Sequence, residues 1–144
     1  MPQSLVEIYV HLVWTTHNRE PLLISDTERS VYRVLASEAA KMNCRILALG
    51  GVADHVHVLV SLPAQYGIPR LLNQMKGASS HLIRATPSGE GFGWQGGYAA
   101  LSVSPNHVPR VQAYVQRQKA HHAECSTFPA WEPSLEQNAP SKAE

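Results

Sequence analysis

The chain has 144 residues, a hydrophobic content of 44%, a charged content of 16% and a formal net charge of +1. This composition is typical of one compact domain and excludes a largely disordered chain. Its apolar runs fall far short of the roughly 20 residues that a membrane helix needs. We see no secretion signal, and the two cysteines lack framework spacing, so we expect reduced thiols and a cytoplasmic protein without membrane contact.

Charge is distributed unevenly along the chain. Four of the 11 acidic residues lie after residue 122, but only one of the 12 basic residues does. Between residues 65 and 122 a single acidic side chain, Glu90, faces six basic ones: Arg70, Lys76, Arg84, Arg110, Arg117 and Lys119. This excess of positive charge is compatible with binding phosphate groups, although such a surface is more often simply solvated.

The first half of the chain predicts a strand, a helix and a hairpin. Alternating apolar residues predict a strand over residues 5–14. Ser25 and Glu28 have the spacing of a capping box, which predicts the start of a helix over about 26–42. Residues 44–62 contain two strand-like runs around the turn "GGVAD" and predict a β-hairpin.

The second half predicts a helix, a strand and a further helix. Apolar residues at helical spacing cover about 68–85. A glycine-rich turn region follows, and "YAALSVS" at 98–104 predicts a fourth strand. Residues 105–124 predict the last helix, with Pro109 tolerated in its first turn.

This order of elements is the split βαβ, or ferredoxin-like, plan of an α+β fold. Two helices would cover one face of an antiparallel sheet, and an extra C-terminal helix would follow. We therefore divide the chain into a domain at 1–124 and an irregular, proline-rich tail at 125–144. Phe128 and Trp131 are the side chains that we expect to pin this tail to the domain.

The predicted strand "HVHVLVSL" carries two histidines on one face. Successive side chains on a strand point to opposite faces, so His55 and His57 lie opposite a row of valines. Because the valine face must meet the helices, we expect both imidazoles on the uncovered face, within reach of a ligand or a partner subunit. The pair is compatible with surface histidines, with a metal site, or with acid–base or nucleophilic chemistry.

A second candidate group lies on the last predicted helix. Tyr114 and Gln118 are four residues apart and share a face, and His121 and His122 follow one turn later. A tyrosine beside an amide and imidazoles is poor core material, which favours a chemical role. The alternative is an ordinary amphipathic helix whose polar side is rich in histidine and glutamine.

Taken together, "HVH" and "YVQRQ" resemble the HUH superfamily of single-strand endonucleases. More closely, the chain resembles the small single-tyrosine transposases of bacterial insertion sequences, including relatives associated with repetitive extragenic palindromes. The resemblance extends in order through "YVHLVWTTHNREPLL", "GGVADHVHVLVSLP", "QMKGASSHLIR", "WQGGYAALSVS" and "VQAYVQRQKAHH". Only the residues after about 124 lie outside it.

The resemblance implies a transposase that cleaves and rejoins single-stranded DNA next to hairpins through a 5′-phosphotyrosine, without a nucleotide cofactor. It implies that Tyr114 is the nucleophile and that His55, His57 and Gln118 bind a divalent cation, Mg²⁺ or Mn²⁺. It also implies a homodimer in which the histidines of one subunit can pair with the tyrosine of the other. Whether the tyrosine acts in cis or in trans stays open.

DNA contacts are predicted more broadly, from basic side chains at Lys76, Arg84, Arg110, Arg117 and Lys119. Trp94 and Tyr98 have rings suited to stacking on unpaired bases, but we favour ordinary packing for both. The alternative functions are a host-adopted HUH nickase and a catalytically silent, hairpin-DNA-binding dimer. A histidine-triad nucleotide hydrolase is disfavoured, because Leu59 stands where a third alternating histidine would be expected.

Overall fold

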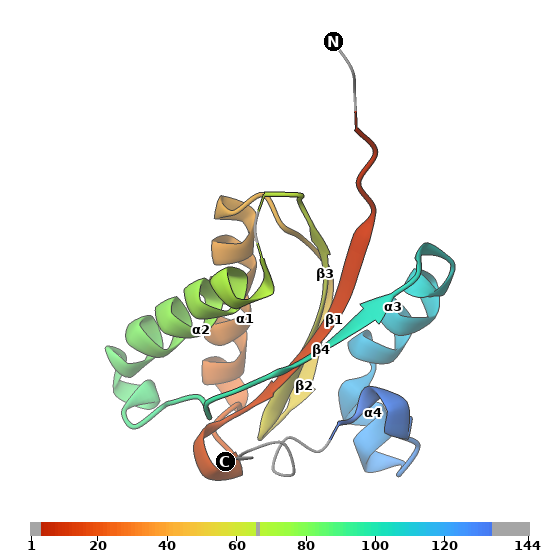
Figure 1. Cartoon of the computed structure of the whole chain (residues 1–144). Coiled ribbons are helices and arrows are strands. Elements are labelled where there is room, and N and C mark those ends of the chain that lie inside the picture. The colour runs from red at the N-terminus through yellow and green to blue at the C-terminus, as the bar shows by residue number, and fades with distance from the viewer. Residues whose placement is uncertain (1–3, 66, 134–144) are drawn as a thin grey trace, which may run out of the picture.

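The computed structural model describes residues 4–65 and 67–133, which form a four-stranded antiparallel sheet with helices on both sides (Figure 1). The sheet has the order β2-β3-β1-β4 and every pairing in it is antiparallel. Its strands are β1 (Ile8–Thr15), β2 (Arg45–Val52), β3 (His55–Leu62) and β4 (Ala99–Val103). The predicted α+β, split βαβ fold is confirmed.

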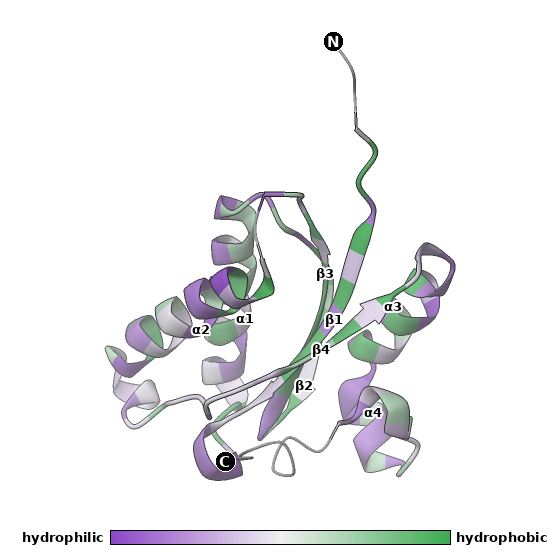
Figure 2. Cartoon of the chain, in the orientation of Figure 1, coloured by the Kyte–Doolittle hydropathy of each residue, from purple (hydrophilic) through white to green (hydrophobic). Residues whose placement is uncertain are grey.

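One face of the sheet is covered by α1 (Ser25–Lys41) and α2 (Ile68–Arg84), which also pack against each other. The valines of β3 point into this layer and are fully buried at Val56, Val58 and Val60. Figure 2 shows apolar residues along β1 and β3 and a mixture of apolar and polar residues on both helices. Each fully buried valine stabilises the fold by about 1.5–3 kcal/mol. The larger of the two hydrophobic clusters lies on this face, which is therefore the main core.

The opposite face is not open, which corrects the expectation of an uncovered sheet. α3 (Val108–Gln116) and α4 (Gln118–Ala123) lie over β2 on this side (Figure 1). A second, smaller core forms there between the sheet and α3, from Ala48, Leu59, Val111 and Val115. The helix that carries the tyrosine is therefore fixed to the face that carries the histidines.

Gly50 on β2 allows α3 to approach the sheet at backbone distance. A Cβ atom at this position would lie 2.1 Å from the carbonyl oxygen of Val115, much closer than van der Waals contact permits. The absence of a side chain thus sets the height of α3 above β2. Because Tyr114 precedes Val115, the same contact helps to place the tyrosine.

Two local predictions are wrong. The first concerns the start of α1, where Ile24 occupies the N-cap position and no side chain makes a capping hydrogen bond. Ser25 is the first residue of the helix and has φ 52°, and Glu28 instead accepts hydrogen bonds from the Tyr32 hydroxyl and the Lys119 ammonium. Glu28 therefore serves a contact between α1 and α4 rather than a capping box.

The second concerns the single helix predicted over 105–124, which is divided in the structure. A 3₁₀ turn covers Pro105–His107, and α3 then ends at Gln116. Arg117, with φ −111° and ψ 30°, separates α3 from α4. None of the helices among the described residues is long and apolar enough to cross a membrane.

Candidate active site

His55 and His57 begin β3, and both are buried, with 4% and 0% of their surface exposed. Their rings lie 5.1 Å apart between centroids on the side of the sheet that α3 and α4 cover. The predicted same-face arrangement is present, but the predicted exposure is wrong. These histidines are buried because the C-terminal part of the chain folds over them.

The Nδ1 atom of each histidine already has a partner. His55 Nδ1 lies 2.8 Å from Asp54 Oδ1, and the other oxygen of Asp54 accepts a hydrogen bond from Arg19 Nε. His57 Nδ1 lies 2.7 Å from Nε2 of His11, a fully buried residue of β1. With both Nδ1 atoms engaged, the Nε2 atoms are left to face the space below α3 and α4.

Tyr114 lies in the last turn of α3 and is only 6% exposed. Its ring stands 6.1 Å from that of His57, stacks on His121 at 4.4 Å and meets Trp131 edge-on at 5.0 Å. The hydroxyl accepts a hydrogen bond from the Phe128 backbone N–H and donates one to the Glu132 carboxylate. The predicted nucleophile and the histidine pair thus come together within one chain.

Gln118, the first residue of α4, is buried with 1% of its surface exposed. Its Oε1 atom lies 3.2 Å from Nε2 of His122. Its Nε2 atom has no hydrogen-bond partner among the residues that the structure describes. The rings of His55, His57 and His122 form a histidine cluster, which the amide borders through His122.

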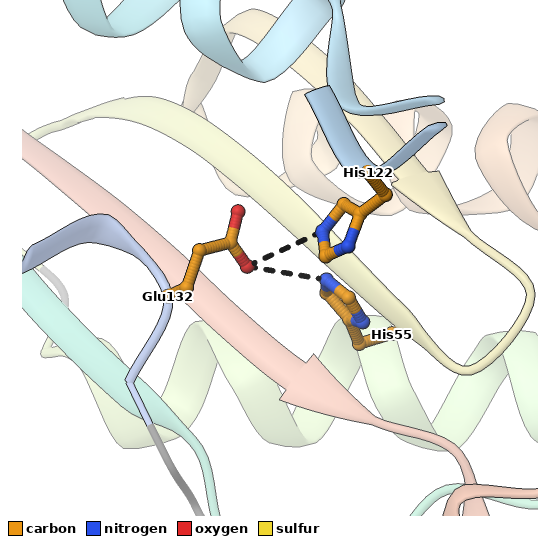
Figure 3. A group of neighbouring side chains, drawn as sticks. All are labelled: His55, His122 and Glu132. Carbon is orange, nitrogen blue, oxygen red and sulfur yellow. Dashed lines mark ion pairs between the residues drawn. The ribbon is translucent and has the colours of Figure 1, made fainter. Parts of the chain in front are cut away.

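Glu132 enters this cluster from the C-terminal segment, where no sequence pattern predicts a role for it. Its Oε1 atom lies 3.1 Å from His57 Nε2, 3.4 Å from His55 Nε2 and 3.6 Å from His122 Nε2. Figure 3 shows His55 and His122 directed at this one carboxylate oxygen. The only sequence signal was the neighbouring Trp131, whose expected packing against the domain does occur, on Tyr114.

Comparison with known proteins identifies the family to which this arrangement belongs. Residues 4–118 match the family model described as "Transposase IS200 like". The chain belongs to the IS200-like transposases. This finding confirms the resemblance drawn from the sequence, and the match ends before the segment that carries Glu132.

Relatives of this transposase share about a quarter of its residues. It is 28% identical over 118 residues to the ISDra2 transposase TnpA of Deinococcus radiodurans, which covers 78% of this chain and 84% of that relative. It is 26% identical over 119 residues to the transposase for the IS200 element of Salmonella typhimurium. This alignment covers 75% of this chain and 74% of that relative.

Two solved structures have a similar fold. A putative transposase from Deinococcus radiodurans superposes with a TM-score of 0.64 at 25% identity, covering 82% of this chain and 98% of that one. A REP-associated tyrosine transposase bound to a REP hairpin also gives a TM-score of 0.64, at 11% identity. This match covers 88% of this chain and 74% of that one. At such low identity the second match shows the fold alone.

The donor atoms of the transposase cluster fit a divalent cation. The ligand atoms of His55, His122 and Glu132 all lie within 4.8 Å of one another. Nε2 of His55 is buried and makes no hydrogen bond within the described part of the chain. A buried lone pair without a donor is costly, and a cation beside the Glu132 carboxylate removes that cost.

The electrostatics of the site keep the tyrosine protonated while Glu132 is docked. Burial, together with the hydrogen bond to Glu132, raises the pKa of Tyr114 to about 12. Burial alone would raise the pKa of Glu132, but the nearby imidazoles of His55 and His57 and the hydrogen bond from Tyr114 outweigh it and hold that pKa well below its usual range. Burial also lowers the pKa of His11 to about 3, so His11 is a neutral partner for His57.

The basic residues of the transposase are divided between two regions. Lys76 and Arg84 line a groove of about 520 Å³ beside Trp94, where Lys76 donates hydrogen bonds to the carbonyls of Gln95 and Gly97. Arg110, Arg117 and Lys119 lie instead on or between α3 and α4. Lys119 is engaged with Glu28 and with the Gly51 carbonyl.

The two aromatic candidates for base stacking differ in their surroundings. Trp94 packs edge-on against Trp14, with ring centroids 5.6 Å apart, and its Nε1 donates to Ser79 Oγ at 2.8 Å. This packing agrees with the interpretation that we favoured from the sequence. Tyr98 is 37% exposed just before β4.

Proposed function

We propose that this transposase cleaves and rejoins single-stranded DNA next to hairpins, with Tyr114 as the nucleophile and His55 and His57 as cation ligands. The observation that carries the proposal is the bridge made by one carboxylate. Glu132 bonds the Tyr114 hydroxyl with one oxygen and approaches the histidine Nε2 atoms with the other. The Tyr114 hydroxyl and the histidine Nε2 atoms therefore border the same small space, which the Glu132 carboxylate occupies.

Each side chain in this proposal has a separate task. His55 and His57 present their Nε2 atoms, which Asp54 and His11 orient from behind. Gln118, which borders the same space, supplies an amide oxygen as a third ligand. A Mg²⁺ or Mn²⁺ ion held by these residues would polarise the scissile phosphate and stabilise charge in the transition state.

The chemical step balances without a nucleotide cofactor. The Tyr114 Oη atom bonds to phosphorus, and the bond from phosphorus to the 3′ oxygen of the preceding nucleotide breaks. The phenol loses its proton and the leaving oxygen gains one, which yields a 5′-phosphotyrosine and a 3′-hydroxyl. The 3′-hydroxyl of another strand reverses this step and joins DNA, because the covalent link retains the phosphodiester.

Tyr114 must exchange Glu132 for the phosphate before it reacts. Burial and the hydrogen bond to the docked carboxylate together raise the pKa of Tyr114 to about 12. A cation held by the histidines would have the opposite effect, because positive charge favours the phenolate. We therefore propose that the segment from Cys125 to Pro133 moves aside when DNA binds.

DNA is held, in this proposal, by basic side chains on both sides of the site. Lys76 and Arg84 contribute from their groove, and Arg110, Arg117 and Lys119 from the helices that cover the histidines. The steepness of the salt dependence of binding reports how many of them meet phosphates. We further propose a homodimer acting in the cytoplasm, in which each tyrosine can serve its own histidines.

A denaturing gel tests this function directly. The full chain is incubated with Mn²⁺ and single-stranded DNA carrying a hairpin from the sequences that flank the gene. A denaturation-resistant protein–DNA band is expected, which Tyr114→Phe removes without weakening hairpin binding. The matched variant Tyr9→Phe, on β1 outside the cluster, keeps the band.

Two results would contradict the assignment. A band that persists in Tyr114→Phe would exclude this tyrosine as the nucleophile. Hairpin binding without any band in the unsubstituted chain would favour the catalytically silent DNA-binding dimer. A nickase differs only in the second half of the reaction, so an added strand with a free 3′-hydroxyl distinguishes it from a transposase.

A further inference from the structure

Glu132 lies beyond the residues that match the family, yet its carboxylate occupies the centre of the histidine cluster. We propose that Glu132 and His122 are ligands of the divalent cation in the DNA-free protein, so that the C-terminal segment completes the metal site. This inference rests on the proposed function of the same site, and it adds two ligands from outside the matched region.

The distances suit shared coordination. Two donor atoms at right angles around a cation, each about 2.1 Å from it, lie roughly 3 Å apart, and opposite donors lie roughly 4 Å apart. Glu132 Oε1 lies 3.1–3.6 Å from three imidazole Nε2 atoms. The ligand atoms of His55, His122 and Glu132 stay within 4.8 Å of one another, so one ion can contact all three.

The hydrogen-bonding inventory also points to a cation. His55 donates its Nδ1 proton to the Asp54 carboxylate, so in the neutral ring Nε2 carries only a lone pair. That lone pair is buried, makes no hydrogen bond within the described residues and faces a carboxylate oxygen 3.4 Å away. Two acceptors at this distance repel each other unless a proton on Nε2 or a metal cation lies between them.

His122 faces the same carboxylate as His55, but it also has an acceptor within hydrogen-bond distance. Its Nε2 atom faces Gln118 Oε1 at 3.2 Å and Glu132 Oε1 at 3.6 Å. Its neighbour His121 has a different role, because it stacks on Tyr114 and its Nδ1 atom bonds Ser126 Oγ. A set of imidazole nitrogens with carboxylate and amide oxygens favours Mn²⁺ over Mg²⁺, because nitrogen ligands bind Mn²⁺ more readily than they bind Mg²⁺.

Cation affinity measured without DNA tests the proposal. The full chain is titrated with Mn²⁺, and free Mn²⁺ is followed by electron paramagnetic resonance. Glu132→Gln is expected to weaken Mn²⁺ binding at least about tenfold, the smallest loss typical of metal-site substitutions. Glu124→Gln removes an exposed carboxylate of the same C-terminal region and should leave the affinity unchanged.

Two neighbouring histidines, His122 and His121, provide an independent test. His122→Ala should also weaken Mn²⁺ binding at least about tenfold, whereas His121→Ala should retain it. This comparison of histidine variants still tests the proposed ligands if Glu132→Gln fails to fold, as judged by circular dichroism. Wild-type affinity in either Glu132→Gln or His122→Ala would overturn the proposal.

The same titration separates this inference from the function on which it depends. If His55→Ala binds Mn²⁺ as the unsubstituted chain does, the histidine cluster is not the cation site and both proposals fail. If His55→Ala loses binding while the Glu132 and His122 variants keep it, only the added ligands are excluded.

Discussion

His55 and His57 differ in the groups behind them, although both are buried beneath the same helices. His55 is backed by the Asp54 carboxylate, which Arg19 also contacts, whereas His57 is backed by the neutral imidazole of His11. A carboxylate makes a ligating imidazole a stronger donor than a neutral partner does. We therefore expect His55 to contribute more to cation affinity than His57.

Asp54→Asn tests the role of this carboxylate. Asparagine keeps the shape of the turn but removes the charge that orients and strengthens His55, so Mn²⁺ binding should weaken about 10- to 100-fold. Isothermal titration calorimetry of the DNA-free protein measures this change. Asp26→Asn, which removes an exposed carboxylate on α1, is the control. Equal affinity in both variants would show that Asp54 only closes the turn.

At the scale of elements, the sequence predicted the strands and the two long helices because their periods are those of a half-buried strand and an amphipathic helix. β3 and its valine face are the strongest case. Periodicity did not reveal the break at Arg117, since residues on both sides of it keep helical spacing. It also misassigned Ser25 and Glu28, because Glu28 is engaged by Tyr32 and Lys119 in the folded chain.

Gly50→Ala tests how the contact between β2 and α3 positions Tyr114. The added Cβ would meet the Val115 carbonyl at 2.1 Å, so α3 must shift, and the free energy of unfolding should fall by about 1–3 kcal/mol. Gly77→Ala in α2 is the matched control, because a Cβ there meets nothing within 4 Å. It should leave stability unchanged or raise it by up to about 1 kcal/mol. Urea denaturation would refute the account if both variants had the same stability.

Glu38 on α1 accepts a hydrogen bond from Gln74 on α2. We expect the stability contributed by this contact to be sensitive to acid. Hydrogen bonds from Gln74 and Lys41 lower the pKa of Glu38 from the ordinary value of 4.5. A carboxyl group with a lowered pKa stabilises the folded state above its unfolded pKa, and this stabilisation is lost as the pH falls through the folded value. The stability difference between the unsubstituted chain and Glu38→Gln should therefore shrink between pH 7 and pH 3. A difference that stays constant in thermal unfolding would contradict this prediction.

At the scale of the whole molecule, the sequence located the candidate residues but not the way in which they are covered. The histidine spacing and the pair formed by Tyr114 and Gln118 were visible as patterns within single elements. His55 and His57 are covered by α3 and α4 and also by Glu132 of residues 125–133. That segment has no period and is placed by contacts such as that of Trp131 with Tyr114. Glu132 was missed for this reason. The rest of the predicted tail, residues 134–144, lies outside the described residues.

The proposed activity requires a covalent bond between this chain and DNA at one tyrosine. Mass spectrometry of the proteolysed adduct, formed with hairpin-bearing single-stranded DNA and Mn²⁺, locates that bond most directly. We predict a nucleotide linked through its 5′-phosphate to the peptide that contains Tyr114. A nucleotide attached to any other residue, or a chain that binds hairpin and Mn²⁺ but yields no modified peptide, would contradict the account.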